Sequence, residues 1–463
     1  MVLPVVEKRR WAKVPKSALN KRALLAKCTY EYANGEIVKE LFDIGDYWLI
    51  PREALGDSTL QKLKVEVSRP TLHFPPAFHN LPKRVSPENA DTERKQRIQT
   101  EVLQIVSKLP GGVIEVEPGT GKTIMAFQLM QEWKVPSLVV VHTKDIQQQW
   151  MRKAQAMLGI TNDRMGLIGG IAKKWSFRNK DLVIALVQSL TRNQDRLPVL
   201  FDKFGAVFYD EVHHMQGEKF RHALPICAGK RIGLSATANA DGLETVFFNH
   251  IGPIVYCDDS PPDLQPLIYY VEVEAQLTNH QLRRIARKNT YMDAEYTFTV
   301  NEVANSHVND AVVHFIHQSE QEKRVQLVLS DRIEQLQYVH QLAGKSSLLI
   351  GSTQDLERES ALHDYTIVCA TTAIALEALD RGEFDTLHIC LPWSKRRRYV
   401  QGIGRILRTS NDKKQPIVYA YDPIDVPLLH NTFTSFRSNA AHFKHQKKSI
   451  IWKNLNHSTS QKL

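Results

Sequence analysis

One stretch decides the fold: Val116-Glu117-Pro118-Gly119-Thr120-Gly121-Lys122-Thr123. It follows a short apolar run and opens a segment with helical periodicity, which is the strand–loop–helix setting of a phosphate-binding loop. The two glycines let backbone N–H groups close around phosphates, and the helix N-terminus favours an anion. Lys122 is predicted to reach the β- and γ-phosphates, and the Thr123 hydroxyl to bind Mg²⁺. Val116 stands where the usual pattern has its first glycine, and the carboxylate of Glu117 must point away from the phosphates.

A second apolar run, of residues 206–209, ends in two carboxylates and two imidazoles: Asp210-Glu211-Val212-His213-His214. Such a run predicts a buried strand whose end presents Asp210 and Glu211 to a bound nucleotide. Asp210 is predicted to hold Mg²⁺, and Glu211 to polarise the attacking water. A zinc site at the two histidines is the alternative, but no further ligand spacing supports it.

A third feature lies far along the chain, in residues 399–408. Gln401, Arg405 and Arg408 recur at intervals of four and three residues, which predicts that they share one helix face. A guanidinium held near a γ-phosphate is what an arginine finger requires.

Short apolar runs alternate with helical segments over most of the chain, which predicts an α/β fold with parallel sheets. Expected strands are 113–116, 138–141, 182–186, 206–209, 232–234, 268–273, 325–329, 348–350, 365–370, 386–391 and 417–421. Expected helices are 122–133, 144–157, 332–343 and 398–407. Proline clusters near residues 70–82 and 261–266 suggest breaks between domains. We therefore predict a small mixed α+β N-terminal accessory domain (1–85), two doubly wound domains (86–258 and 259–430) and a basic C-terminal tail (431–463).

The composition is that of a globular protein, with 463 residues, 43% hydrophobic and 24% charged. Five scattered cysteines without paired spacing give no sign of a zinc site or a disulfide framework and fit a reducing compartment. No secretory signal or membrane span is expected. The formal net charge of +10 is uneven: residues 1–30 carry +7, residues 431–463 carry +6, and the core between them carries −3. We expect the basic ends to tether nucleic acid in a salt-sensitive way.

These motifs together resemble superfamily 2 helicases and translocases of the DExH type, over residues of about 90 to 425. The resemblance implies two RecA-like domains with ATP·Mg²⁺ at their interface. It assigns Asp210 to His213 to the DExH box, and Ser235 and Thr237, with His213, to coupling between nucleotide and strand. It implies an adenine-reading role for Gln96 and a nucleotide role for Asp380. Contacts with nucleic acid are implied for His142, Thr143, Lys144, Gln188 and Thr371.

Within the superfamily, Ser235-Ala236-Thr237 followed by Asp241-Gly242-Leu243 is most similar to the XPB/UvsW-like branch. Phage branch-migration helicases and poxvirus transcript-release helicases resemble the chain in size and in the segment 47–52. Ala238, Asn239 and Ala378 depart from the usual pattern of this family at positions tied to coupling and strand contact. Trp133, Trp150 and Trp393 are expected to be packing residues.

The resemblance implies an ATP-hydrolysing motor, with ATP and Mg²⁺ as cofactors, that remodels duplex or branched DNA during branch migration or fork processing. An RNA helicase and a viral transcription helicase that releases nascent RNA are the alternatives, and a non-catalytic nucleic-acid clamp is the remote one. A monomer in the cytoplasm is expected, or in the host cytoplasm or nucleoid if the source is viral. Replication, recombination or transcription proteins are the possible partners.

Overall fold

The structure is a computed structural model of the chain. It describes residues 4–172, 174–238, 242–258, 260, 263–286, 292–353, 355–377, 379, 381–393, 396–408, 413–440 and 446–452. The chain divides into two compact units, Met1–Asp259 and Ser260–Leu463, and each is described here by itself. Four positions named above lie outside the described residues: Asn239, Asp241, Ala378 and Asp380.

The first unit begins with a small mixed module. Among the described residues, its main sheet has the strand order β5-β6-β2-β1-β7, and β3 pairs with β4 as a separate hairpin. The helices are α1 (Lys21–Lys27) and α2 (Asp57–Lys62), and their apolar residues share one core with the sheet. The strands are β1 (Val5–Lys8), β2 (Trp11–Pro15), β3 (Thr29–Glu31), β4 (Ile37–Lys39), β5 (Phe42–Ile44), β6 (Tyr47–Pro51) and β7 (Glu66–Ser68).

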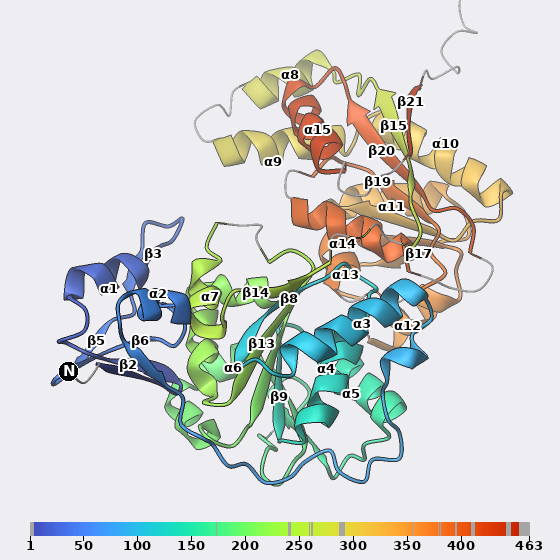
Figure 1. Cartoon of the computed structure of the whole chain (residues 1–463). Helices are drawn as coiled ribbons and strands as arrows, with labels where there is room; N and C mark the ends of the chain where they lie inside the picture. The colour runs from blue at the N-terminus through green and yellow to red at the C-terminus, as the bar shows by residue number, and fades with distance from the viewer. Residues whose placement is uncertain are drawn as a thin grey trace, which may run out of the picture. The chain divides into compact units, whose positions relative to one another are not determined.

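The rest of the first unit is a parallel sheet covered on both faces. Among the described residues its order is β10-β11-β9-β12-β13-β8-β14. One core lies under α3, α4 and α5, and a second under α6 and α7 (Figure 1). The strands are β8 (Gly111–Glu115), β9 (Ser137–Val141), β10 (Met165–Ile168), β11 (Leu182–Leu186), β12 (Ala206–Asp210), β13 (Lys230–Ser235) and β14 (Ile254–Cys257). The helices are α3 (Glu93–Val106), α4 (Lys122–Trp133), α5 (Lys144–Leu158), α6 (Val187–Arg192) and α7 (Thr245–Ile251).

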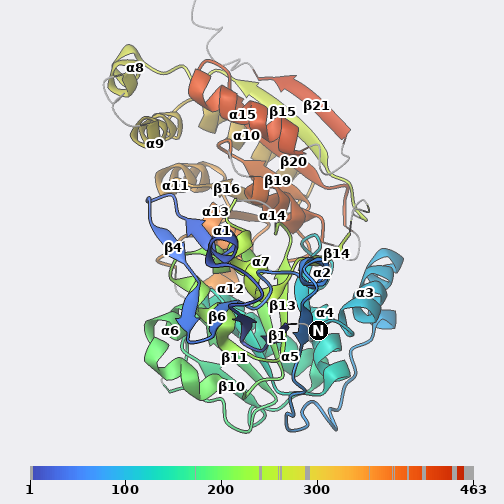
Figure 2. The same cartoon turned by 60° about the vertical axis from the view of Figure 1, so that its left-hand side comes forward.

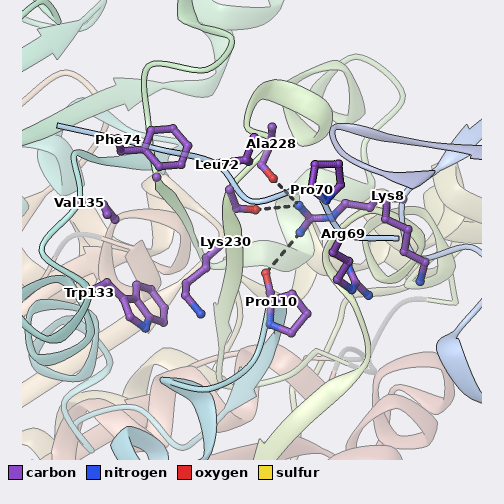
Figure 3. Close-up of a pocket in the computed structure, with 13 residues that line it drawn as sticks. Lys8, Arg69, Pro70, Leu72, Phe74, Pro110, Trp133, Val135, Ala228 and Lys230 are labelled. Carbon is purple, nitrogen blue, oxygen red and sulfur yellow. Dashed lines mark hydrogen bonds between the residues drawn. The ribbon is translucent and has the colours of Figure 1, made fainter. Parts of the chain in front are cut away.

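The N-terminal module is joined to this sheet by two fully buried arginines. Arg52 donates from Nη1 to the carbonyls of Ala228 (3.2 Å) and Gly229 (2.7 Å), and Nη2 lies 3.4 Å from the Pro110 carbonyl oxygen (Figure 3). Arg231 donates to the carbonyls of Cys227 (2.8 Å), His250 (2.9 Å) and Arg10 (2.7 Å). Burial, together with the nearby positive charge of Arg231, lowers the pKa of Arg52 to about 9.

A carboxylate strengthens the same contact. Glu40 is buried, and it accepts hydrogen bonds from His250 Nε2 (2.8 Å) and Arg221 Nη1 (2.9 Å). The ring of Trp11 meets the ring of His250 edge-on, with centroids 5.2 Å apart, which places the module's sheet beside α7 (Figure 2). Because buried polar groups must be paired, these contacts make the module an integral part of the first unit.

A cavity of about 340 Å³ lies in this seam, against Pro110, Val135, Gly205 and Lys230, at the amino ends of β8, β9, β12 and β13 (Figure 3). The phosphate-binding loop follows the carboxyl end of β8, at the opposite edge of the sheet. The cations of the cavity wall are already engaged with protein acceptors; Lys230 Nζ, for example, donates to the carbonyls of Ser107 and Leu109. We therefore interpret the cavity as a packing seam.

The second unit contains another parallel sheet. Among the described residues its order is β17-β18-β16-β19-β20-β15-β21. The strands are β15 (Leu267–Val273), β16 (Gln326–Ser330), β17 (Ser347–Leu349), β18 (Ile367–Thr371), β19 (Thr386–Ile389), β20 (Ile417–Pro423) and β21 (Gln446–Ile451). The helices are α8 (Asn279–Ala286), α9 (Met292–Val303), α10 (Val308–Gln321), α11 (Ile333–Leu342), α12 (Asp355–His363), α13 (Thr372–Glu377), α14 (Arg396–Ile406) and α15 (Pro427–Ala440). The predicted fold class, two parallel α/β sheets after a mixed module, is confirmed.

Part of the stretch expected to be a basic C-terminal tail (431–463) is folded in the structure. Residues 431–440 complete α15, where Phe433 and Phe436 are buried, and β21 pairs in parallel with β15 at the edge of the sheet. The strand was missed because Lys447 and Lys448 interrupt its apolar pattern. Lysines are common on exposed edge strands, where they oppose pairing with another chain. Among the described residues, no helix combines the length and apolar composition needed to cross a membrane.

Candidate functional site: a phosphate loop beside two carboxylates

The phosphate-binding loop spans the gap between β8 and α4. Gly119 and Gly121 have positive φ angles of 85° and 99°, which a side chain would strain. Lys122 is the first residue of α4, and its Nζ donates to the Val116 carbonyl at 3.3 Å. Thr120 is buried and its hydroxyl donates to the Glu117 carbonyl at 2.9 Å, which closes the turn. Thr123 follows in the first turn of α4, where the residue is half-buried.

Glu117 is held by a cation from another helix. Arg94 of α3 donates from Nη2 to Glu117 Oε2 (3.1 Å) and to Asp258 Oδ2 (2.6 Å). Burial raises the pKa of Glu117, and the guanidinium of Arg94 opposes that shift. This pairing accounts for a carboxylate in a phosphate-binding loop, because Arg94 balances its charge. It also links the loop to Asp258, close to the end of the first unit.

Gln99 is a site residue that the sequence did not single out. It is 1% exposed, its Nε2 lies 3.5 Å from the Thr120 carbonyl oxygen, and its Oε1 accepts a hydrogen bond from Gln128 (3.0 Å). A Cβ at Gly121 would lie 3.0 Å from the same Nε2. Gln96, expected to read adenine, is exposed one turn earlier in α3. The helical spacing of the sequence could have identified Gln99, because residues 98, 99, 102 and 106 form the buried face of α3.

Replacing Gln99 by leucine should raise the KM for ATP about three- to tenfold, because a buried hydrogen bond contributes about 1 kcal/mol to holding the loop. The matched control is Gln96→Leu, in the same helix. Steady-state ATPase kinetics on both variants check this. A larger effect at Gln96 would instead support its role as the adenine reader.

The two carboxylates lie at the carboxyl end of β12. Asp210 Oδ2 accepts a hydrogen bond from the Trp150 indole N–H at 2.7 Å, and Oδ1 accepts from the backbone N–H of Glu211 at 3.1 Å. Burial and the neighbouring Glu211 raise the pKa of Asp210, and the Trp150 hydrogen bond opposes this. Glu211 Oε1 lies 3.9 Å from Lys122 Nζ, so the DExH carboxylates and the loop lysine are brought together.

Glu211 itself has a left-handed backbone, with φ of 46°. Such a conformation is unfavourable for a residue with a side chain and is typical of functional sites. A chain of contacts follows from its side chain. His213 Nδ1 lies 3.5 Å from Glu211 Oε2 and 3.1 Å from the Ser235 hydroxyl, and the Ser235 hydroxyl accepts from the Thr237 backbone N–H at 3.0 Å. The three residues expected to couple nucleotide and strand therefore form one network with Glu211.

The residues expected to contact nucleic acid in this unit lie at the ends of neighbouring strands. Gln188 Nε2 donates to the His142 carbonyl at 2.7 Å. The His142 ring lies 3.8 Å from that of His214, measured between centroids. Thr143 caps α5 through its hydroxyl, and Lys144 is exposed at the first position of that helix. Their contacts with nucleic acid stay a prediction.

In the second unit, Gln401 is buried in α14 and Thr371 ends β18. The Arg405 guanidinium donates to the carbonyls of Leu376, in α13, and Leu379, so here it holds the end of α13. Arg408 lies beyond α14, which ends at Ile406, so the three residues do not share one helix as expected. The polar sequence Thr409-Ser410-Asn411 that follows has low helix propensity, which is consistent with an early end.

The donor set in the first unit fits ATP with Mg²⁺. A hydroxyl at Thr123 and a carboxylate at Asp210 are the oxygen ligands that Mg²⁺ prefers. The loop glycines, the α4 N-terminus and Lys122 provide for phosphates. Bound Mg²⁺ would supply charge neutralisation at the phosphates, held by Thr123 and Asp210.

Several helicases are similar to this chain in sequence. Residues 88–240 match the family described as "Type III restriction enzyme, res subunit". A probable helicase of Escherichia phage T5 is 26% identical over 66% of this chain and 66% of its own length. A putative ATP-dependent RNA helicase of Acanthamoeba polyphaga mimivirus is 23% identical over 80% and 70%. The DNA 3'-5' helicase XPB of Mycobacterium tuberculosis is 26% identical over 67% and 57%.

Two solved structures share the fold at 14% identity and a TM-score of 0.54. One is the type ISP restriction-modification enzyme LlaBIII bound to DNA, matched over 80% of this chain and 32% of that chain. The other is S. cerevisiae Dbp5 bound to RNA and ADP BeF3, matched over 79% and 96%. With its phosphate-binding loop and its DExH box, the chain is similar to ATP-dependent helicases of superfamily 2, among them the XPB and phage helicases.

Proposed function

We propose that this chain is a DNA motor that uses ATP hydrolysis to remodel duplex or branched DNA. The observation that carries the proposal is the group formed by Lys122, Asp210 and Glu211, with Glu211 Oε1 3.9 Å from the lysine Nζ. Lys122 would bind the phosphates, Asp210 would hold Mg²⁺, and Glu211 would orient the attacking water. Arg405 and Arg408 are proposed as the arginine fingers supplied by the second unit.

DNA is favoured as the substrate because the XPB relative is named as a DNA helicase, and the phage relative is named as a probable helicase. A second candidate is an RNA helicase, or a viral helicase that releases nascent RNA, because the mimivirus relative is named as an RNA helicase. The same group of residues would hydrolyse ATP in both cases, so the track must be identified by experiment.

ATPase stimulation by a panel of nucleic acids tests the proposal. Duplex DNA, single-stranded DNA, a four-way junction and RNA are compared at one salt concentration, with Lys122→Ala as the control. We expect the junction and the duplex to stimulate most. If RNA stimulates most, the second candidate is favoured, and a release assay on a stalled polymerase follows. No stimulation by any nucleic acid, with Lys122→Ala behaving identically, would exclude a motor.

The salt dependence of DNA binding should respond to trimming, provided that β21 is kept. Deleting residues 453–463 removes Lys453 and Lys462 and should reduce the slope of log K against log salt by at most ~2, since each phosphate contact contributes about 0.9. Basal ATPase should not change. Fluorescence anisotropy with a labelled duplex at several salt concentrations measures the slope. An unchanged slope would mean that this end does not tether DNA.

A further inference from the structure

The Trp150 indole lies in the first unit's core but makes a polar contact at the site. Trp150 is 2% exposed in α5, and its Nε1–H donates to Asp210 Oδ2 at 2.7 Å. From sequence it was expected only to pack. The distance is short for a neutral donor and typical of a hydrogen bond to a carboxylate.

We propose that Trp150 is a positioning residue for Mg²⁺ binding, because its indole N–H holds the Asp210 carboxylate in the orientation that binds the ion. This inference rests on the proposed ATPase function and deepens it. Trp150 does not touch the nucleotide and acts only through Asp210.

The remaining contacts of Asp210 show what the indole does. A carboxylate offers about four acceptor positions. The Glu211 backbone N–H takes one on Oδ1, and the Trp150 N–H takes one on Oδ2. One donor on each oxygen opposes rotation of the carboxylate, and the other acceptor positions stay available for Mg²⁺. An indole N–H can only donate, so it does not compete with the ion for this role.

The indole is in turn held by the helix that carries the phosphate-binding loop. The ring of Phe127, in α4, meets the Trp150 ring edge-on with centroids 5.4 Å apart. Such aromatic pairs have a preferred geometry. Phe127 of α4 therefore contacts Trp150, and Trp150 contacts Asp210. This packing fixes the position of Asp210 relative to α4, the helix that begins with Lys122.

Two substitutions separate the hydrogen bond from the packing. Trp150→Phe keeps a large apolar ring but removes the donor. Trp150→His loses more volume, but its Nε2 takes the same place relative to Cβ as the indole Nε1, so it can donate to Asp210. Trp133→Phe is the matched control, because Trp133 packs against the same core and donates its own N–H to the Ser107 carbonyl at 2.9 Å.

Binding of a fluorescent ADP analogue is titrated with Mg²⁺, and its affinity in EDTA is measured separately. For Trp150→Phe we expect the Mg²⁺ concentration at half-saturation to rise about tenfold, with affinity in EDTA unchanged. Trp150→His should stay within about threefold of the wild type although it melts at a lower temperature, since it loses more buried volume. Trp133→Phe should leave the Mg²⁺ midpoint unchanged.

A double-mutant cycle completes the test. In an Asp210→Asn background, Trp150→Phe should add no further change in the Mg²⁺ response, because the two residues act as a unit. If the two substitutions have additive effects, or if the Mg²⁺ midpoint follows the melting temperature across all variants, Trp150 contributes only to packing. Either result would overturn the inference and leave the proposed function standing. A wild-type protein whose nucleotide binding ignores Mg²⁺ would overturn both.

Discussion

Replacing Lys122 by alanine should lower the kcat of ATP hydrolysis at least about a hundredfold without unfolding the protein. Removal of one preorganised charge at a transition state typically has an effect of this size. The fold should tolerate the substitution, because Lys122 Nζ contacts the Val116 carbonyl and, at 3.9 Å, the Glu211 carboxylate, and neither group needs the lysine for the fold. Stopped-flow or coupled ATPase assays measure the rate, and circular dichroism checks the fold.

Glu211→Gln is the companion variant. It should reduce kcat by a similar factor but preserve ATP binding, since the amide keeps the shape and loses the charge that orients water. Lys62→Ala, an exposed lysine of α2, is the control for loss of a positive charge. Residual hydrolysis above a tenth of the wild-type rate in both site variants would contradict the assigned roles.

Replacing Arg231 by alanine should destabilise the first unit by about 3–5 kcal/mol, the usual effect of breaking a buried charged network. The substitution leaves two buried carbonyls, those of Cys227 and His250, and the partly buried carbonyl of Arg10 without their donor. Relief of the repulsion between Arg231 and Arg52 offsets only part of this. Because the Arg10 carbonyl belongs to the N-terminal module, we also expect that module to become sensitive to protease.

Urea denaturation and limited proteolysis measure the two effects. Arg9→Ala is the control, because the Arg9 side chain is 60% exposed and should change stability by less than about 0.5 kcal/mol. By the same reasoning, deletion of residues 1–85 should give an insoluble or unfolded protein. A stable, active deletion variant would show that the module is a separate recognition domain and that its buried contacts contribute little.

Local patterns in the sequence predicted the part of the site that depends on neighbours in the chain. The loop 116–123 and the Asp210–Glu211 pair follow buried strands, and both strands and the helix 122–133 were expected within a residue or two. Glycine positions and strand ends are local signals, and this is why the fold class followed from them.

Contacts between distant segments could not be predicted in this way. Trp150 meets Asp210 across 60 residues, and Arg94 meets Asp258 across 164. That Gln99 lies against the phosphate-binding loop depends on which face of α3 is buried, and β21 forms by pairing with the distant β15. Which distant residues come into contact is determined by tertiary packing, and the local pattern of a single sequence does not reveal it.

The pairing of β15 with β21 has a consequence for synthesis on the ribosome. β15 ends at Val273 and is translated long before β21, which begins at Gln446. Its partner on the other side, β20, begins at Ile417, so β15 has neither neighbour while most of the second unit is made. An apolar strand with unpaired edges tends to pair with other strands, including those of other nascent chains, and this leads to aggregation. We therefore expect folding of the second unit to depend on chaperones. The last strand of the first unit ends at Cys257, so we expect that unit to fold while the second is still being translated.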